Sequence, residues 1–130
     1  MPQEFEDEAG AGSGIAASTV IAEIRRKLGD EDAGNYRWSD SILLGYVDSG
    51  HRDVCQKRPD LFMKSDLSGL NTPGVLTLST ALYLDERWLA ALGLYGAFRA
   101  LSEDGNDAGD TEQGLRYWQQ YLLELGIASG

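Results

Sequence analysis

The chain has few of the residues that build disulfides, metal centres and membrane spans. Its 130 residues include one cysteine, Cys55, and one histidine, His51. A single cysteine excludes a disulfide within the chain and a zinc site built on cysteine ligands. No stretch approaches the roughly 20 consecutive apolar residues that span a bilayer, and the first residues lack the basic and apolar regions of a signal peptide. We therefore expect no membrane segment and a reducing, intracellular context.

Basic residues are outnumbered by acidic ones, 11 against 21, which gives a net charge of -10. The acidic excess is concentrated in residues 1–14, 29–34 and 103–110. Such a surface repels phosphate, which argues against a protein that reads nucleic-acid sequence. It is compatible with a wall past which DNA slides without sticking, and equally with acidic loops that only keep the protein in solution.

The chain offers no arrangement of residues that indicates catalysis. His51 and Cys55 lie four residues apart on an expected helix, but nothing marks the oxyanion hole that such a pair needs. A packed thiol is the simpler interpretation of Cys55. Compared with a calcium-binding loop, the segment from Asp104 has Ala108 where an oxygen ligand belongs, and the segment from Asp30 fails similarly. We expect no enzyme, no cofactor and no dedicated metal site, and only adventitious binding of divalent ions at acidic loops stays open.

Residues 1–17 indicate an arm outside the folded domain. They are rich in Glu, Gly, Ala and Ser, a composition that buries too little apolar surface to order itself. Besides Met1, the only sizeable apolar side chains of the arm are Phe5 and Ile15. We expect these two to anchor the arm on a neighbouring subunit or partner.

Apolar residues at helical spacing predict a first helix over Thr19–Leu28, capped by Ser18 or Thr19 and stopped by Gly29. The last turn is basic, which suits the helix dipole. The same side chains could instead contact phosphate or an acidic partner. They are Arg25, Arg26 and Lys27.

A second helix is predicted from the capping residue Ser39 to about Lys57, where Pro59 ends it. Its apolar side includes Ile42, Leu43, Tyr46, Val47 and Val54. Gly45 and Gly50 are unusual inside a helix, since each costs roughly 1 kcal/mol relative to Ala. Close approach of another helix or subunit would offset that cost.

Residues 63–84 change character. Turn residues followed by weak alternation at 75–78 predict a β-hairpin or an extended loop with its tip near Asn71. A lone hairpin is marginal in water, so this insert should pack on the helices or pair across subunits.

Two more helices are predicted after the insert. The third begins near Asp85 and ends near Leu101 or Ser102, with Gly93 and Gly96 permitting close packing. The fourth begins with the capping pair Asp110 and Gln113 and ends at Gly126.

These elements predict a mainly α fold: a small four-helix bundle with an insert between helices two and three and an extended N-terminal arm. The helical domain covers about residues 18–126, and residues 127–130 form a short tail. The predicted core residues are Ile24, Trp38, Tyr46, Val47, Trp88, Leu92, Trp118 and Leu122.

The order of several short motifs resembles that of a known family. The motifs are YRWSD at 36–40, DSGHRD at 48–53, RPD at 58–60, LDERWL at 84–89, GAFRALS at 96–102 and LRYW at 115–118. Their order and spacing over residues 18–126 are similar to those of the head–tail adaptor (connector or neck) proteins of tailed bacteriophages.

The resemblance implies a structural virion protein rather than an enzyme. Subunits of this family form a homo-oligomeric ring, commonly of twelve, between the portal protein and the next tail or neck protein. DNA passes through the lumen without sequence-specific binding, which places the ring in the neck of the virion after assembly in the host cytoplasm. A closed ring needs two different, complementary surfaces on each subunit. The expected subunit or partner contacts are Phe5, Ile15, Arg25, Arg26, Lys27, Lys57, Arg58 and Asn71.

The chain departs from some family members, which dock to the portal with a C-terminal extension, because only five residues follow Leu125. Either the N-terminal arm takes that role or the portal reaches to this protein. Two other interpretations stay open. One is another neck or tail-completion ring protein, of the head-closure or tail-terminator type, and the other is an acidic interaction module unrelated to virions.

Overall fold

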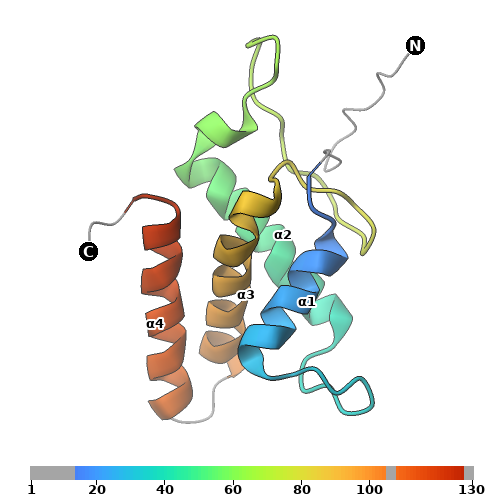
Figure 1. Cartoon of the computed structure of the whole chain (residues 1–130), viewed down its shortest axis with the longest axis vertical. Coiled ribbons are helices and arrows are strands. Elements are labelled where there is room, and N and C mark those ends of the chain that lie inside the picture. The colour runs from blue at the N-terminus through green and yellow to red at the C-terminus, as the bar shows by residue number, and fades with distance from the viewer. Residues whose placement is uncertain (1–13, 105–107, 128–130) are drawn as a thin grey trace.

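The computed structural model describes residues 14–104 and 108–127. Over these residues the fold is mainly α, as predicted (Figure 1). Its α-helices are α1 (Ala17–Leu28), α2 (Asp40–Lys57), α3 (Leu89–Asp104) and α4 (Ala108–Glu124). Two short 3-10 helices, η2 (Pro59–Phe62) and η3 (Glu86–Trp88), lie between α2 and α3. No helix in the described residues is long and apolar enough to cross a membrane.

Helix α3 is the centre of the bundle and contacts α1, α2 and α4 (Figure 1). Its residues 91–97 are all buried, as expected of a helix that is apolar on most sides. Two glycines let α1 lie close to it. A Cβ atom at Gly96 would stand 2.2 Å from Ile24 Cδ1, and one at Gly93 would stand 2.5 Å from Glu23 Cγ. The close packing predicted at these glycines is confirmed.

The start of α1 differs from the prediction that Ser18 or Thr19 caps it. The helix begins at Ala17, and the preceding residue, Ala16, has no side chain that can cap it. The backbone N–H groups of Ala17 and Ser18 donate instead to carbonyl oxygens of residues 80 and 78, both at 2.9 Å. Because a distant loop accepts these first N–H groups, a side-chain cap is not required.

Helix α2 begins and ends as predicted. The Ser39 hydroxyl accepts the Ile42 N–H at 3.2 Å, and the helix ends at Lys57 before Pro59. Ile42 was expected on the apolar side, but its side chain is 48% exposed, whereas Leu43 is fully buried. Successive residues are about 100° apart around a helix, so Ile42 faces away from the core.

The segment 63–84 is an extended loop, and the predicted β-hairpin is absent from the described residues. The β pairing found there consists of isolated bridges, Ala16 with Ala81 and Met63 with Leu70. The later part of the loop lies beside residues 14–18 of the same chain and bonds to them. Residues 78–84 are thus joined to the residues that lead into α1.

Residues 14–18 are held by their own chain. The N–H groups of Gly14 and Ile15 donate to the carbonyl oxygens of Leu82 (2.9 Å) and Leu84 (3.0 Å), and the Leu82 N–H donates back to Ile15 (2.8 Å). A Cβ atom at Gly14 would stand 1.9 Å from the Leu84 oxygen, so only glycine permits this approach. Ile15 thus lies in the core of its own chain. It was expected instead to anchor the arm on a neighbouring subunit or partner.

The third and fourth helices begin at different residues from those predicted. Asp85 caps η3 by accepting a backbone N–H at 3.0 Å, and α3 follows only at Leu89. Helix α4 begins at Ala108, so Asp110 and Gln113 lie within it and not at its cap. Asp110 forms an ion pair at 3.5 Å with the loop between α1 and α2, which removes it from a capping role.

All eight predicted core residues lie in or against the hydrophobic core. The buried ones are Ile24, Trp38, Val47 and Leu92. The half-buried ones, which pack against the buried cluster, are Tyr46, Trp88, Trp118 and Leu122.

Candidate functional site

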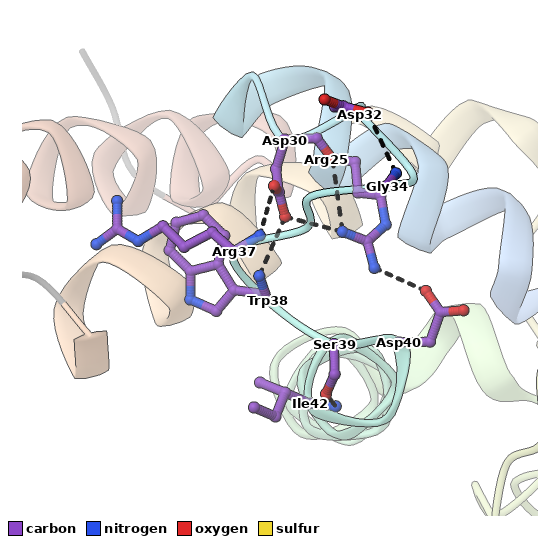
Figure 2. Close-up of polar contacts among 9 residues, drawn as sticks. All are labelled: Arg25, Asp30, Asp32, Gly34, Arg37, Trp38, Ser39, Asp40 and Ile42. Carbon is purple, nitrogen blue, oxygen red and sulfur yellow. Dashed lines mark hydrogen bonds and ion pairs between the residues drawn. The ribbon is translucent and has the colours of Figure 1, made fainter.

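A buried ionic network joins α1 to the start of α2 (Figure 2). The Arg25 guanidinium donates to Asp30 Oδ2 at 2.8 Å and to Asp40 Oδ1 at 2.7 Å. It also lies 3.3 Å from the centre of the Tyr36 ring. Arg25 is only 4% exposed, and a buried charge is stable only when it is paired and hydrogen-bonded.

Asp30 orders the loop that leads into α2 (Figure 2). Its carboxylate accepts the backbone N–H groups of Arg37 (2.8 Å) and Trp38 (3.2 Å), in addition to the Arg25 bond. These bonds place Trp38 in the core and position Ser39 to cap the helix. The acidic loop therefore contains a structural carboxylate. Arg25, expected at a partner contact, has an internal role instead.

The two basic residues that follow Arg25 are paired with their own helix. Arg26 and Lys27 both bind the carboxylate of Glu23, with closest nitrogen–oxygen distances of 2.5 Å and 3.5 Å. Arg26 is largely exposed, whereas Lys27 is mostly covered. Only Arg26 of the three presents much of its side chain to solvent.

Arg58 fastens the end of α2 to the end of α4. Its guanidinium pairs with Asp60 at 2.9 Å and donates to the Leu125 carbonyl oxygen at 2.5 Å. That carbonyl belongs to the last turn after α4, where no intrahelical donor is left. Arg58 also lies over the Trp88 ring at 5.5 Å. It acts as a cap for a helix distant in sequence, which spacing alone does not reveal.

Asp53 is shared between α2 and α4. It accepts from Lys57 Nζ at 2.9 Å and from the Tyr121 hydroxyl at 2.6 Å. Burial, followed by the bond to Asp53, raises the pKa of Tyr121 above its ordinary value, so the hydroxyl stays a neutral donor. Lys57, another expected contact residue, therefore has a partner inside its own chain.

The surface is acidic because carboxylates outnumber cations, 21 against 11. Most of the cations are already paired with carboxylates of the same chain, and the remaining carboxylates are not neutralised. Within the described part of the chain, the cations that form no ion pair with a carboxylate are Lys64, Arg87 and Arg116. Exposed carboxylates such as Glu31 and Glu86 are left to face solvent. This surface repels phosphate.

His51 is fully buried between α2 and the end of the long loop. Its Nε2 accepts the backbone N–H of Tyr83 at 3.1 Å, and its ring lies against those of Tyr83 and Phe62. Its Nδ1 has no hydrogen-bond partner among the residues that the structure describes. Burial lowers the pKa of His51 to about 4, against a smaller raising effect of Asp48. No hydrogen bond joins it to Cys55 in the described residues, and burial raises the pKa of that thiol.

The first part of the long loop forms a closed turn, which we call the tip (residues 63–70). Its base is fixed by the Asn71 N–H, which donates to the Phe62 carbonyl at 2.6 Å. Inside the tip, the Lys64 N–H donates to Gly69 O at 2.9 Å. Asn71, expected at the tip, closes its base instead. The tip is thus a defined turn that stands out from the bundle (Figure 1).

Leu67 is the unusual residue of the tip. Its φ angle is 64°, and no other non-glycine residue of the described chain has a positive φ. An L-residue in the left-handed region is strained by about 1–2 kcal/mol. Leu67 is also 73% exposed, so the described part of the chain offers it little packing in return. Backbone strain at an exposed apolar side chain is typical of a contact site.

A hollow of about 250 Å³ lies between α2 and the later part of the loop; we call it the Gly45 hollow. It is lined by Ser41, Leu44, Gly45, Asp48, Val75 and Leu76. Val75 on its rim is 85% exposed. Among the described residues, a Cβ atom at Gly45 would meet nothing within 4 Å, so none of them fills the space that this glycine leaves open.

A second apolar surface lies on α4. Leu115, Leu123 and Ile127 are each about half exposed. Helix α4 packs on α3 and stands on the side of the bundle away from the long loop (Figure 1). The molecule therefore has exposed apolar side chains on two separate sides.

Of the expected contact residues, Phe5 lies outside the described residues. In the described ranges, no group of three or more His, Cys, Asp or Glu side chains could hold a metal ion. Comparison of the chain with protein-family models, curated proteins and solved structures found no match.

Proposed function

We propose that this protein is a structural subunit of a ring in the neck of a tailed bacteriophage, where it joins the portal of the head to the tail. The proposal begins from the motif order that resembles head–tail adaptors. The mainly α bundle with a long insert between α2 and α3 agrees with it. The role is one of assembly, and we assign no catalytic residue.

One observation carries the proposal: the chain combines exposed apolar side chains with an acidic, internally neutralised surface. Leu67 and Val75 on the loop and Leu115 on α4 are exposed on different sides of the bundle. A ring subunit needs two unlike surfaces for its neighbours, and further surface for the portal and the tail. An acidic lumen would let DNA pass with little adhesion.

The test is electron microscopy of the full chain mixed with the portal ring encoded in the same genome. An added coaxial layer of subunits, commonly twelve, below the portal is the expected result. A gel-shift assay with duplex DNA at low salt should show no retention by the free chain. Rings that ignore the portal would favour a head-closure or tail-terminator protein. A monomer that ignores the portal would favour an acidic interaction module outside the virion.

A further inference from the structure

We propose that the Leu67 side chain of one copy inserts into the Gly45 hollow of a second copy. This inference rests on the proposed ring and names the contact that builds it. It is carried by two positions at which the chain departs from ordinary local preferences and gains nothing within its own fold.

The first position is Leu67. The left-handed backbone at φ 64° favours glycine or asparagine. The chain instead places a leucine there and exposes 73% of it. The rest of the turn is well ordered, because Asp66 accepts both the N–H (3.0 Å) and the hydroxyl (2.7 Å) of Ser68. The turn therefore presents an apolar side chain to solvent at its outer end.

The second position is Gly45. A glycine within a helix costs about 1 kcal/mol relative to Ala, and the same helix shows how such a cost is offset. At Gly50, a Cβ atom would stand 2.9 Å from the Tyr95 ring, which occupies the space. At Gly45 a Cβ atom would meet no atom of another described segment within 4 Å. The space is open, next to the exposed Val75.

The two departures are complementary. Leu67 is an apolar side chain without a pocket, and the Gly45 hollow is a partly apolar pocket without a side chain. Its volume of about 250 Å³ is enough for one leucine. Natural chains break local rules mainly where another requirement acts on them. A single contact between copies meets both requirements.

One chain cannot make this contact with itself. The tip rises at the top of Figure 1, whereas the first half of α2, which carries Gly45, lies lower on the right. A second copy can satisfy both sites. Because the inserted side chain and the hollow are different surfaces, the contact is heterologous, and its repetition builds a ring or a filament.

Charge also favours a second copy. A net charge of -10 opposes self-association, so a contact between copies should bring a cation to a carboxylate. Lys64 of the tip makes no ion pair in the described residues, whereas Asp48, which lines the Gly45 hollow, already pairs with Arg52 at 3.2 Å. Insertion of the tip would add the Lys64 cation to an interface that this carboxylate also lines.

Two variants test the inference without unfolding the subunit. Leu67→Asn removes the apolar side chain and suits the left-handed backbone. Gly45→Leu fills the hollow and is a better helix former than glycine. Each should melt at or above the wild-type temperature and yet lose the ring, as measured by native mass spectrometry under the conditions in which the wild type assembles. Leu67→Met, which keeps an apolar side chain, is the matched control and should retain the ring.

Mixing the two variants gives the sharpest result. The intact tip of Gly45→Leu can enter the intact hollow of Leu67→Asn, but the new pair has no second working contact. A 1:1 dimer and no larger species is the expected product.

Failures of the two proposals can be told apart. Rings in either single variant, or only monomers in the mixture, overturn this inference while leaving a wild-type ring on the portal intact. A single variant that keeps the ring but loses portal binding would indicate that the hollow binds the portal. That result would also overturn the proposed contact between copies. If the wild type shows neither a ring nor a layer on the portal, the proposed function is wrong. If the mixture of Gly45→Leu and Leu67→Asn then also stays monomeric, the contact between copies is wrong as well.

Discussion

Gly45 and Gly50 lie five residues apart in α2, but the structure treats them in opposite ways. At Gly50 the Tyr95 ring of α3 fills the space that a side chain would take, and at Gly45 that space faces the open hollow. The same contrast separates the bundle from the long loop. In the bundle, the missing side chains at Gly50 and Gly96 are matched by neighbours from another helix. On the loop, Leu67 has a strained backbone and an exposed side chain without such a neighbour.

The comparison separates residues that hold the subunit from residues available to another molecule. Several expected contact residues belong to the first group, because Arg25, Lys57 and Arg58 all bond within the chain. Leu67, Val75 and the Gly45 hollow belong to the second. Substitutions in the first group should reduce stability, and those in the second should change assembly without reducing stability.

The largest effect is expected at Arg25. Arg25→Gln leaves the Asp30 carboxylate buried without its cation, and breaking a buried pair lowers the free energy of unfolding by about 3–5 kcal/mol. Urea unfolding followed by circular dichroism measures this. Arg26→Gln is the matched control, since Arg26 is exposed and its loss should change little. If the two substitutions changed the free energy of unfolding equally, Arg25 would again be a candidate for a partner contact.

Acid should weaken the fold through His51. The folded pKa of about 4 lies below the ordinary 6.5, so the folded state disfavours the protonated ring. The stability that the neutral ring contributes is complete above pH 6.5 and is lost as pH falls toward 4, with a total on the order of 3 kcal/mol.

The measurement is the unfolding free energy of the wild type minus that of His51→Gln across this pH range. The difference cancels the contributions of the groups that titrate in both proteins. It should shrink from pH 6.5 to pH 4, because Gln carries no titrating ring. A difference that does not change with pH contradicts the assignment.

The glycine pair should give effects of opposite sign. Gly50→Ala forces a Cβ against Tyr95, and overpacking costs about 1–3 kcal/mol. Gly45→Ala enters open space and should raise the free energy of unfolding by up to about 1 kcal/mol. The two variants carry the same glycine-to-alanine substitution at two positions of α2. Thermal melts of both variants and of the wild type compare their stabilities. Destabilisation by both would mean that the hollow is not open in solution.

The smallest effect on stability is expected at Leu67. Leu67→Asn relieves the left-handed backbone and removes no packing, so the free energy of unfolding should rise by at most about 1 kcal/mol. Chemical denaturation at a low protein concentration, where the chain is monomeric, isolates this effect from assembly. A clear loss of stability would show that Leu67 packs within its own subunit.

Sequence patterns located most of the helical fold. Ser39 as the α2 cap and Gly29 as the α1 stop were correctly predicted, because caps depend on residues close in sequence. The start of α1 was not, since its first N–H groups bond to carbonyls of residues 78 and 80. Of the two forms expected for residues 63–84, the extended loop is found and the hairpin is not, in the described residues. Residues 78–84 bond to residues 14–18, and such long-range pairing leaves no local signal.

The candidate site was harder to predict. Arg25 and Arg26 are neighbours in a basic triplet, and only tertiary structure separates the buried charge from the exposed one. Gly45 and Gly50 carry the same sequence signal, and the prediction of close packing applies within the chain only to Gly50. Leu67 could not be identified from the sequence, because a positive φ angle at a leucine is visible only in the structure.

We infer that the bundle folds stably without a partner and that the tip contacts another molecule during assembly. The most direct test is the native mass of the wild type and of Leu67→Asn, each alone and each with the portal ring. We predict a ring, or a full layer on the portal, for the wild type, and a stably folded monomer for the variant. Equal masses for the two proteins, under every condition, would contradict it.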